Sequence, residues 1–296
     1  KYIKIIITAI FLASCQNTMD TTKTQKLLEV SSTSEIYSTK PIEEISFVPN
    51  NVASWLGHLI MIDKTGSILR ANASDRTTKL VATGSYKDVI GTSLKNKSGL
   101  FFAINNQGVI EAFTETTNSG DFTFLENINA LDGFIKFCET TRSNNKIIAI
   151  KNNRKIFNIT YRINEKEKSI ITTETEIEFP ASSCLTSKSV NLLGKYNLTL
   201  NDKLLELNGD QNGRIILKIT NGLSIKGTNY PSGVHLTNQN MGSVFNKGLI
   251  AVTLEEESRI ILLSAIPSAR FSVTVTLYSL FIFFRVSGLM STTHIC

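Results

Sequence analysis

The feature that most constrains the fold of this chain is a hairpin pattern that recurs five times. Each unit joins two short runs of β-branched, aromatic or leucine residues through a polar turn, as in a pair of antiparallel strands. The units start at residues 59, 100, 147, 196 and 249, so neighbouring starts lie 41 to 53 residues apart. They are Leu59–Ala71, Leu100–Phe113, Ile147–Ile159, Tyr196–Leu207 and Leu249–Leu263. Most of their turns contain Asn, Asp or Gly, as tight reversals require.

A period of this size leaves room for about four strands in each interval and is typical of a blade array. We therefore predict an all-β fold, a β-propeller of five to six four-stranded blades, whose completeness at the C-terminal end the sequence leaves open. The alternative is a β-sandwich, in which single strands recur at short spacing. After residue 30, no window shows convincing helical periodicity.

The sequence also predicts the positions of three further strands in this fold. Gly133–Glu139 is short and apolar, which favours an inner strand beside the propeller axis. Ser169–Phe179 alternates Ile, Thr and Glu, as expected for an outer strand with one solvated face. We expect Ile42–Val48 to close the ring by joining the blade that contains Leu249–Leu263, because closure removes exposed sheet edges.

The N-terminus has the pattern of an exported protein. Lys1 and Lys4 precede an apolar run, and small residues follow it directly before Cys15. Leu12–Cys15 resembles the bacterial lipoprotein box, which implies cleavage before Cys15 and lipidation of that residue. The apolar run is shorter than the roughly 20 residues of a spanning helix. Gln16 stands where an inner-membrane retention signal of bacterial lipoproteins would have Asp, so the resemblance implies the outer membrane, on its periplasmic side.

The predicted organisation has four parts: a signal peptide over residues 1–14, a lipidated flexible tether over 15–40, a propeller domain over 41–267 and an atypical tail over 268–296. The tether is rich in Thr, Ser, Lys and Gln. The tail contains no Asp, Glu, Lys, Asn or Gln, although Lys and Asn are frequent before it. Its apolar stretch Phe271–Phe284 leaves three interpretations: a segment foreign to the natural protein, a final strand, or a membrane segment.

The middle of the chain resembles bacterial phytase-like propeller proteins. The resemblance lies in Asp132–Cys138, Ile147–Ile163 and Glu176–Leu185, which look like two consecutive blades. It implies a propeller fold and, for the activity, a calcium-loaded acidic channel. This chain departs from that pattern because its candidate inner strands lack clustered carboxylates. They carry Lys136, Glu139, Ser182, Ser183, Ser232 and His235 instead.

Candidate chemistry is sparse. The three histidines, His58, His235 and His294, are too scattered for a recognisable metal site, so we assign no metal ligand, cofactor or catalytic residue. His235 is the histidine closest to a predicted inner strand and is the functional group to test; the alternative is a hydrogen-bonded structural histidine. A nucleophile elbow, a phosphate loop and a dinucleotide fingerprint are all missing from the sequence.

Two cysteines have the spacing of one blade. Cys138 and Cys184 lie 46 residues apart, at the ends of two candidate inner strands. Because exported thiols oxidise, we expect a disulfide between them. The alternative is a pair of free cysteines that pack as small apolar side chains.

Together these patterns predict a lipoprotein that is held to the membrane by its lipid anchor and whose propeller is a non-enzymatic binding or scaffold module. A protein partner fits this interpretation. Nucleic acid does not, because the net charge of +6 comes from interspersed charges of both signs. The alternative is a degenerate phytase-like phosphohydrolase that requires calcium. A third class, resembling the lipoprotein scaffold of the outer-membrane protein insertion machinery, lacks support because Trp55 is the only tryptophan.

Overall fold

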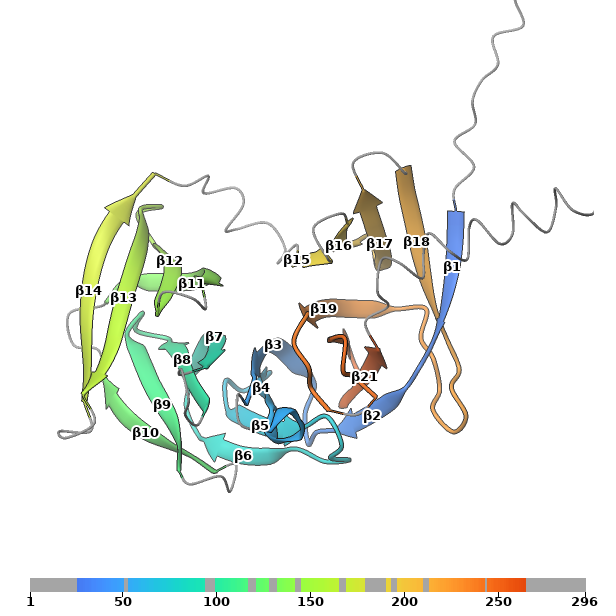
Figure 1. Cartoon of the computed structure of the whole chain (residues 1–296), viewed down its shortest axis with the longest axis horizontal. Coiled ribbons are helices and arrows are strands. Elements are labelled where there is room, and N and C mark those ends of the chain that lie inside the picture. The colour runs from blue at the N-terminus through green and yellow to red at the C-terminus, as the bar shows by residue number, and fades with distance from the viewer. Residues whose placement is uncertain are drawn as a thin grey trace, which may run out of the picture.

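The computed structural model describes 21 strands and one 3₁₀ turn within residues 26–50, 53–93, 99–116, 121–127, 132–141, 145–164, 169–178, 190–192, 196–209, 213–242 and 244–264. The strands form five sheets, antiparallel except for one parallel pair, and these sheets follow one another around the molecule as blades (Figure 1). The protein is therefore a β-propeller, as predicted, and the five blades that the described residues form fall within the predicted range.

The first three blades each consist of four consecutive strands, numbered from the inner to the outer edge. Blade I contains β3 (Ile42–Val48), β4 (His58–Asp63), β5 (Ile68–Asn72) and β6 (Lys79–Ala82), with the 3₁₀ turn η1 (Ser54–Leu56) between β3 and β4. Blade II contains β7 (Tyr86–Ser93), β8 (Gly99–Asn105), β9 (Ile110–Thr116) and β10 (Asp121–Asn127). Blade III contains β11 (Phe134–Thr141), β12 (Lys146–Lys151), β13 (Ile156–Asn164) and β14 (Ser169–Ile177).

The other two blades each add a strand from the N-terminal segment. Blade IV contains β15 (Val190–Leu192), β16 (Tyr196–Asn201), β17 (Leu204–Gly209) and β18 (Gly213–Thr220), and β1 (Lys26–Ser31) pairs with β18 in parallel. Blade V contains β19 (Pro231–Thr237), β20 (Leu249–Leu254) and β21 (Arg259–Ser264), and β2 (Ser34–Tyr37) completes it.

The five hairpins predicted from the sequence are confirmed as the second and third strands of the five blades. Their turns show the expected chemistry. In the turn of blade I, Asp63 Oδ1 accepts the backbone N–H of Thr65, and Gly66 has a φ of 79°. Gly66 also lies against the start of β7, and its carbonyl accepts the N–H of Tyr86 at 3.0 Å. This turn therefore shapes its own blade and positions the next one.

The predicted places of two single strands are also confirmed. The segment Gly133–Glu139 overlaps β11, the inner strand of blade III. The segment Ser169–Phe179 overlaps β14, the outer strand of the same blade, and its exposed and partly buried residues alternate. A solvated face on an outer strand explains this alternation.

The strand that closes the ring differs from the prediction. Ile42–Val48 is β3, the inner strand of blade I, and four of its seven residues are buried. Closure comes instead from β2, which pairs antiparallel with β21 in the predicted blade. The prediction selected the longer apolar segment. In a propeller such a segment belongs at the buried axis, whereas the outer position suits a short strand with a single buried side chain, Ile36.

The boundary between tether and propeller also lies earlier than predicted. Residues 26–40 were expected to be flexible, but β1 and β2 lie within them, along the outer edges of blades IV and V (Figure 1). Val30 and Ile36 belong to two apolar clusters of the core. Burial of these two side chains explains why a mostly polar segment is part of the fold.

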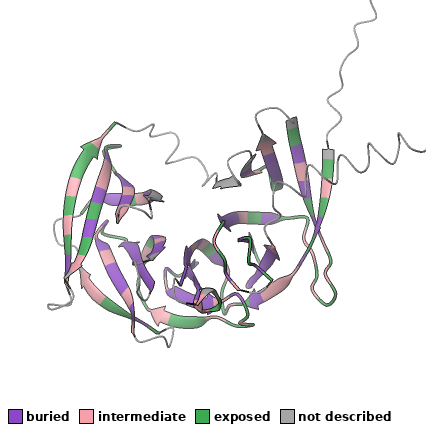
Figure 2. Cartoon of the chain, viewed as in Figure 1, coloured by how far each residue is buried: buried purple, intermediate pink, exposed green. Residues whose placement is uncertain are grey.

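The core consists of apolar clusters shared by neighbouring blades. Separate clusters join blades I and II, II and III, IV and V, and V and I. Figure 2 shows that buried residues are concentrated on the inner and central strands of the blades. Within the described residues, no cluster of this kind joins blades III and IV. The described ranges also contain no helix with the length and apolar character that a membrane span requires.

Candidate functional site

His235 lies where the sequence placed it, on the inner strand of blade V. Its side chain is buried, and its backbone is paired with Ala251 of the adjacent strand β20. On the same strand, the Ser232 hydroxyl oxygen lies 3.2 Å from the hydroxyl oxygen of Thr253. The prediction of an inner-strand position is confirmed, but burial encloses the imidazole within the blade and gives it little contact with solvent.

The other predicted residues are only partly described. Lys136 and Glu139 both lie on β11. Cys138 lies on the same strand and is disulfide-bonded. Its pairing with Cys184 stays a prediction, since Cys184 lies outside the described residues. Other parts of the sequence predictions are also outside them: the signal peptide over 1–14, Cys15, Ser182, Ser183 and the tail over 268–296 with His294.

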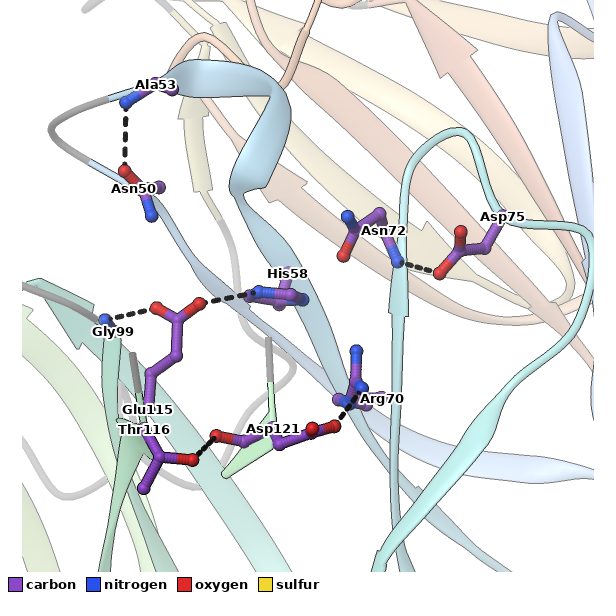
Figure 3. Close-up of polar contacts among 10 residues, drawn as sticks. All are labelled: Asn50, Ala53, His58, Arg70, Asn72, Asp75, Gly99, Glu115, Thr116 and Asp121. Atoms are coloured by element: carbon purple, nitrogen blue, oxygen red, sulfur yellow. Dashed lines mark hydrogen bonds and ion pairs between the residues drawn. The ribbon is translucent and has the colours of Figure 1, made fainter. Parts of the chain in front are cut away.

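The structure brings together a pair that the sequence did not predict, at the junction of blades I and II (Figure 3). His58 begins β4, and Glu115 is near the end of β9. The two residues are 57 positions apart, and His58 Nε2 lies 3.3 Å from Glu115 Oε1. The number and spacing of the histidines in the sequence could not reveal this pair, because the two residues become neighbours only when blades I and II pack together.

Both residues of this pair are almost completely enclosed. The side chains of His58 and Glu115 are 2% and 1% exposed. The second carboxylate oxygen of Glu115 accepts the backbone N–H of Gly99 at 2.8 Å. The Phe122 ring packs edge-on against the imidazole, with 5.3 Å between the ring centroids. Glu115 thus connects β4 of blade I to β8 of its own blade.

The close approach of β8 depends on Gly99. A β-carbon at this position would lie 2.4 Å from Cγ1 of Val48, a distance that real side chains do not adopt. The absence of a side chain lets the Gly99 N–H reach Glu115 while β8 stays packed against blade I.

A second polar bridge crosses the same junction. Arg70 on β5 donates from Nη2 to Oδ1 of Asp121 on β10, at 2.5 Å. The Arg70 side chain is buried, whereas that of Asp121 is 67% exposed. The Thr116 hydroxyl donates to the backbone carbonyl of Asp121 at 3.0 Å and holds the start of β10 (Figure 3). The side chains that join blades I and II thus include one fully enclosed pair and one pair with a single exposed partner, Asp121.

Polar contacts also join blades II and III. The carboxylate of Asp88, on β7, accepts the backbone N–H of Phe137 at 2.6 Å. The hydroxyl groups of Thr92 and Tyr161 lie 2.8 Å apart. Burial raises the pKa of Tyr161, although the hydrogen bond to Thr92 acts in the opposite direction. Each of these polar groups finds its hydrogen-bond partner on the neighbouring blade. Buried polar groups need such partners, because burial removes their hydrogen bonds to water.

The chemistry of the His58 pair follows from its burial. A general base must reach the proton that it removes, and a nucleophile must reach its substrate. The imidazole and the carboxylate are 2% and 1% exposed, so the surrounding side chains keep a substrate away from them. We therefore interpret the pair as a structural connection between blades. Among the described residues, no three His, Cys, Asp or Glu side chains gather in a group that could hold a metal ion.

Comparisons with known proteins give the following results. The chain matches no model of a known protein family and no curated protein. Among solved structures, it is similar to Saccharomyces cerevisiae Sqt1, with 11% identity, a TM-score of 0.37 and coverage of 76% of this chain and 72% of that chain.

Two further structures are similar at a comparable level. The N-terminal domain of Nup159 shows 12% identity and a TM-score of 0.32, with coverage of 76% of this chain and 65% of that one. A chain in an S. cerevisiae complex of Dbp5 with Nup159, Gle1, IP6 and ADP shows 13% identity, the same TM-score of 0.32 and the same coverage of 76% and 65%. This chain thus spans slightly less than two thirds of the length of these two chains.

Proposed function

We propose that this protein is an exported lipoprotein, lipidated at Cys15 and held at the periplasmic side of the outer membrane, whose propeller binds a protein partner. The sequence of the N-terminus supports the anchor. The observation that supports the partner is an apolar cavity between blades IV and V, bordered by exposed apolar side chains and ion pairs. A binding or scaffold role accounts for this cavity and requires no catalytic group.

The cavity has a volume of about 290 Å³ and is lined mainly by apolar side chains. Leu27 of β1, Leu204 of β17 and Pro231 of β19 are among its lining residues. Leu27 is 56% exposed and Leu204 is 39% exposed. Tyr230, next to Pro231 in the chain, is 71% exposed. Apolar surface is thus available to a partner around the cavity as well as within it.

Charged residues stand at the edge of this surface. Lys203 Nζ lies 2.8 Å from a carboxylate oxygen of Glu255, and Lys218 Nζ lies 3.1 Å from one of Glu29. The Glu255 carboxylate raises the pKa of Lys203, and Lys203 in turn lowers that of Glu255. An apolar centre with a charged rim is the usual arrangement of a protein–protein interface.

The size of the cavity favours a protein partner over a small ligand. Pockets for small molecules occupy about 300–1,000 Å³ and enclose most of the ligand. The volume of this cavity is slightly below that range and the cavity is bordered by open surface, so it fits an apolar anchor side chain from a larger partner. Such an anchor in a central pocket supplies much of the binding energy of many interfaces.

The partner surface can be tested by site-specific photo-crosslinking in cells. We expect a photo-reactive amino acid at position 204 to give one dominant adduct, and the same group at position 230 to give an adduct with the same protein. Leu80 on β6 is a matched control, because it is 61% exposed but lies on blade I. The adduct should disappear when Leu27→Glu places a charge at the cavity. Equal adducts at positions 80 and 204, or an adduct unaffected by Leu27→Glu, would contradict the proposed surface.

The anchor has an independent test. Cells that express the full chain are labelled with radioactive palmitate, and the protein is then isolated. We expect label in the native protein and in the control variant Cys296→Ala, but none in Cys15→Ala, because the other cysteines do not follow an apolar run and small residues. Equal label in the native protein and Cys15→Ala would exclude Cys15 as the lipidation site.

A further inference from the structure

We propose that a patch on the loops of blades I and V, formed by Trp55, Val244 and Lys247, contacts the membrane surface to which the protein is anchored. The inference rests on the proposed lipid anchor and adds an orientation to it. The patch combines an exposed aromatic ring, an exposed aliphatic side chain and a basic group on two adjacent loops. These loops connect the first and second strands of their blades.

Trp55 is held outward by a short, hydrogen-bonded turn. It is the middle residue of η1, and its side chain is 68% exposed. The Leu56 N–H donates to the carbonyl of Ala53 at 2.9 Å, and the Ala53 N–H donates to Asn50 Oδ1 at 2.9 Å (Figure 3). These bonds fix the loop, so the exposure of Trp55 is a built-in feature of the fold.

The second loop presents Val244 in a similar way. Val244 is 60% exposed, but Met241 and Phe245, in the same loop, are each 2% exposed and belong to the core between blades V and I. The Ser264 hydroxyl donates to the carbonyl of Val244 at 3.1 Å. The backbone is therefore fixed on both sides of Val244, while its side chain remains in solvent.

The two loops lie against each other at Gly242. This residue has a φ of 117°, and a β-carbon placed on it would lie 3.8 Å from Cα of Trp55. Lys247 is exposed and lies three residues after Val244, in a turn closed by the bond from the Gly248 N–H to the Phe245 carbonyl at 3.1 Å. The aromatic, aliphatic and basic groups thus belong to one structured surface.

The position of the tether favours a membrane as the occupant. In an antiparallel four-stranded sheet, the first and third connections lie at the same end of the strands. Trp55 and Val244 lie on first connections, and β1 enters the fold beside the third connection of blade IV, where Lys26 pairs with Ile215. The chain therefore leaves the propeller toward the lipid on the side that carries the patch.

The length of the tether keeps this side close to the bilayer. Residues 15–25 connect the proposed lipid attachment to β1. Eleven residues of extended chain span at most about 36–40 Å, and a flexible chain of this length spans on the order of 18 Å on average. Tryptophan favours the boundary between lipid and water, and a lysine is attracted to anionic head groups. The chemistry of the patch matches the surface that the tether brings near.

Trp55 fluorescence tests this proposal directly, because the chain contains no other tryptophan. The full chain from residue 16 onward, with an N-terminal hexahistidine in place of the lipid, is bound to vesicles of phosphatidylethanolamine and phosphatidylglycerol that carry a nickel-chelating lipid. We expect a blue shift of the emission, protection from acrylamide, and quenching when the acyl chains are brominated.

Variants test whether the response comes from the patch or from any exposed apolar side chain. Val244→Glu should abolish quenching by the brominated acyl chains. Lys247→Gln removes one positive charge and, on vesicles without the nickel-chelating lipid, should weaken the association by about fivefold when phosphatidylglycerol is present and leave it unchanged on neutral phosphatidylcholine. The control is Leu80→Glu on β6, which should retain the native response. An unchanged Trp55 emission on vesicles, or an equal loss in Leu80→Glu and Val244→Glu, would overturn the proposal.

This design also separates the patch from the lipid anchor. The hexahistidine replaces the lipid, so the fluorescence response does not depend on modification of Cys15. A Trp55 response without palmitate incorporation would support the patch and refute the anchor. Palmitate incorporation without a Trp55 response would support the anchor and refute the patch.

Discussion

Ile36→Ala will destabilise the propeller by about 2–5 kcal/mol, the usual cost of removing a fully buried isoleucine side chain. Ile36 has no exposed surface, and it packs in the cluster shared by blades V and I. It is also the only fully buried side chain of β2, the strand that closes the ring. Loss of this anchor therefore weakens both the core and the closure.

Closure gives this variant a second observable effect. When β2 detaches, β21 becomes an edge strand, and unpaired backbone groups on such an edge favour association between chains. Arg259 of β21 also loses its partner on β2, since its Nη1 lies 3.3 Å from Glu35 Oε2. We expect Ile36→Ala to show a lower urea midpoint and increased oligomerisation by size-exclusion chromatography.

The matched control for Ile36→Ala is Leu80→Ala. Leu80 lies on β6, which has the same outer position in blade I that β2 has in blade V, but its side chain is 61% exposed. Its replacement should change stability by no more than about 0.5 kcal/mol. Equal urea midpoints for the two variants would show that β2 does not hold the ring closed.

The parts of the fold that the sequence predicted are those with a local pattern. Each central hairpin has two apolar runs and a turn with its own chemistry, as in the turn from Asp63 to Gly66, and these features are contiguous in the chain. The inner strand at Gly133–Glu139 and the outer strand at Ser169–Phe179 could be found in the same way. Hydrophobic period and turn residues were sufficient because the pairing partners are neighbours in sequence.

The parts that the sequence missed depend on contacts between distant segments. β2 has four residues and one fully buried side chain, so it carries no periodic signal that distinguishes it from a polar tether. β1 pairs in parallel with β18, about 190 positions later in the chain. His58 and Glu115 meet only when blades I and II dock. Local patterns cannot identify such contacts because the information lies in how the blades are arranged around the ring.

The surface that supports the proposed partner was also beyond the sequence. The cavity between blades IV and V takes residues from β1, β17, β18 and the approach to β19. Leu27 was assigned to a tether, and Leu204 was assigned to a hairpin with no function. Only the parallel addition of β1 to blade IV brings Leu27 to the cavity. The error in the tether boundary therefore concealed a feature of the candidate binding surface.

The second large effect is expected at the junction of blades I and II. His58→Leu should destabilise the protein by about 3–5 kcal/mol, because it removes one partner from a buried polar pair and leaves a carboxylate in an apolar environment. The Gly99 N–H still contacts Glu115 in this variant, but the contact between His58 Nε2 and Glu115 Oε1 is lost. Burial prevents water from replacing the lost partner at low cost.

The double variant His58→Leu with Glu115→Leu decides whether the loss comes from the pair itself. When both side chains are replaced by apolar ones, the penalty for a buried carboxylate without its His58 partner disappears, but the Gly99 N–H loses its acceptor, so only part of the stability should return. The interaction energy from the double-mutant cycle, measured by urea unfolding, should therefore be large.

Lys155 and Glu176 provide the control cycle, since their contact of 2.8 Å joins side chains that are 53% and 52% exposed. An exposed pair contributes about 0–1 kcal/mol. Equal interaction energies in the two cycles would show that the His58 pair does not join the blades.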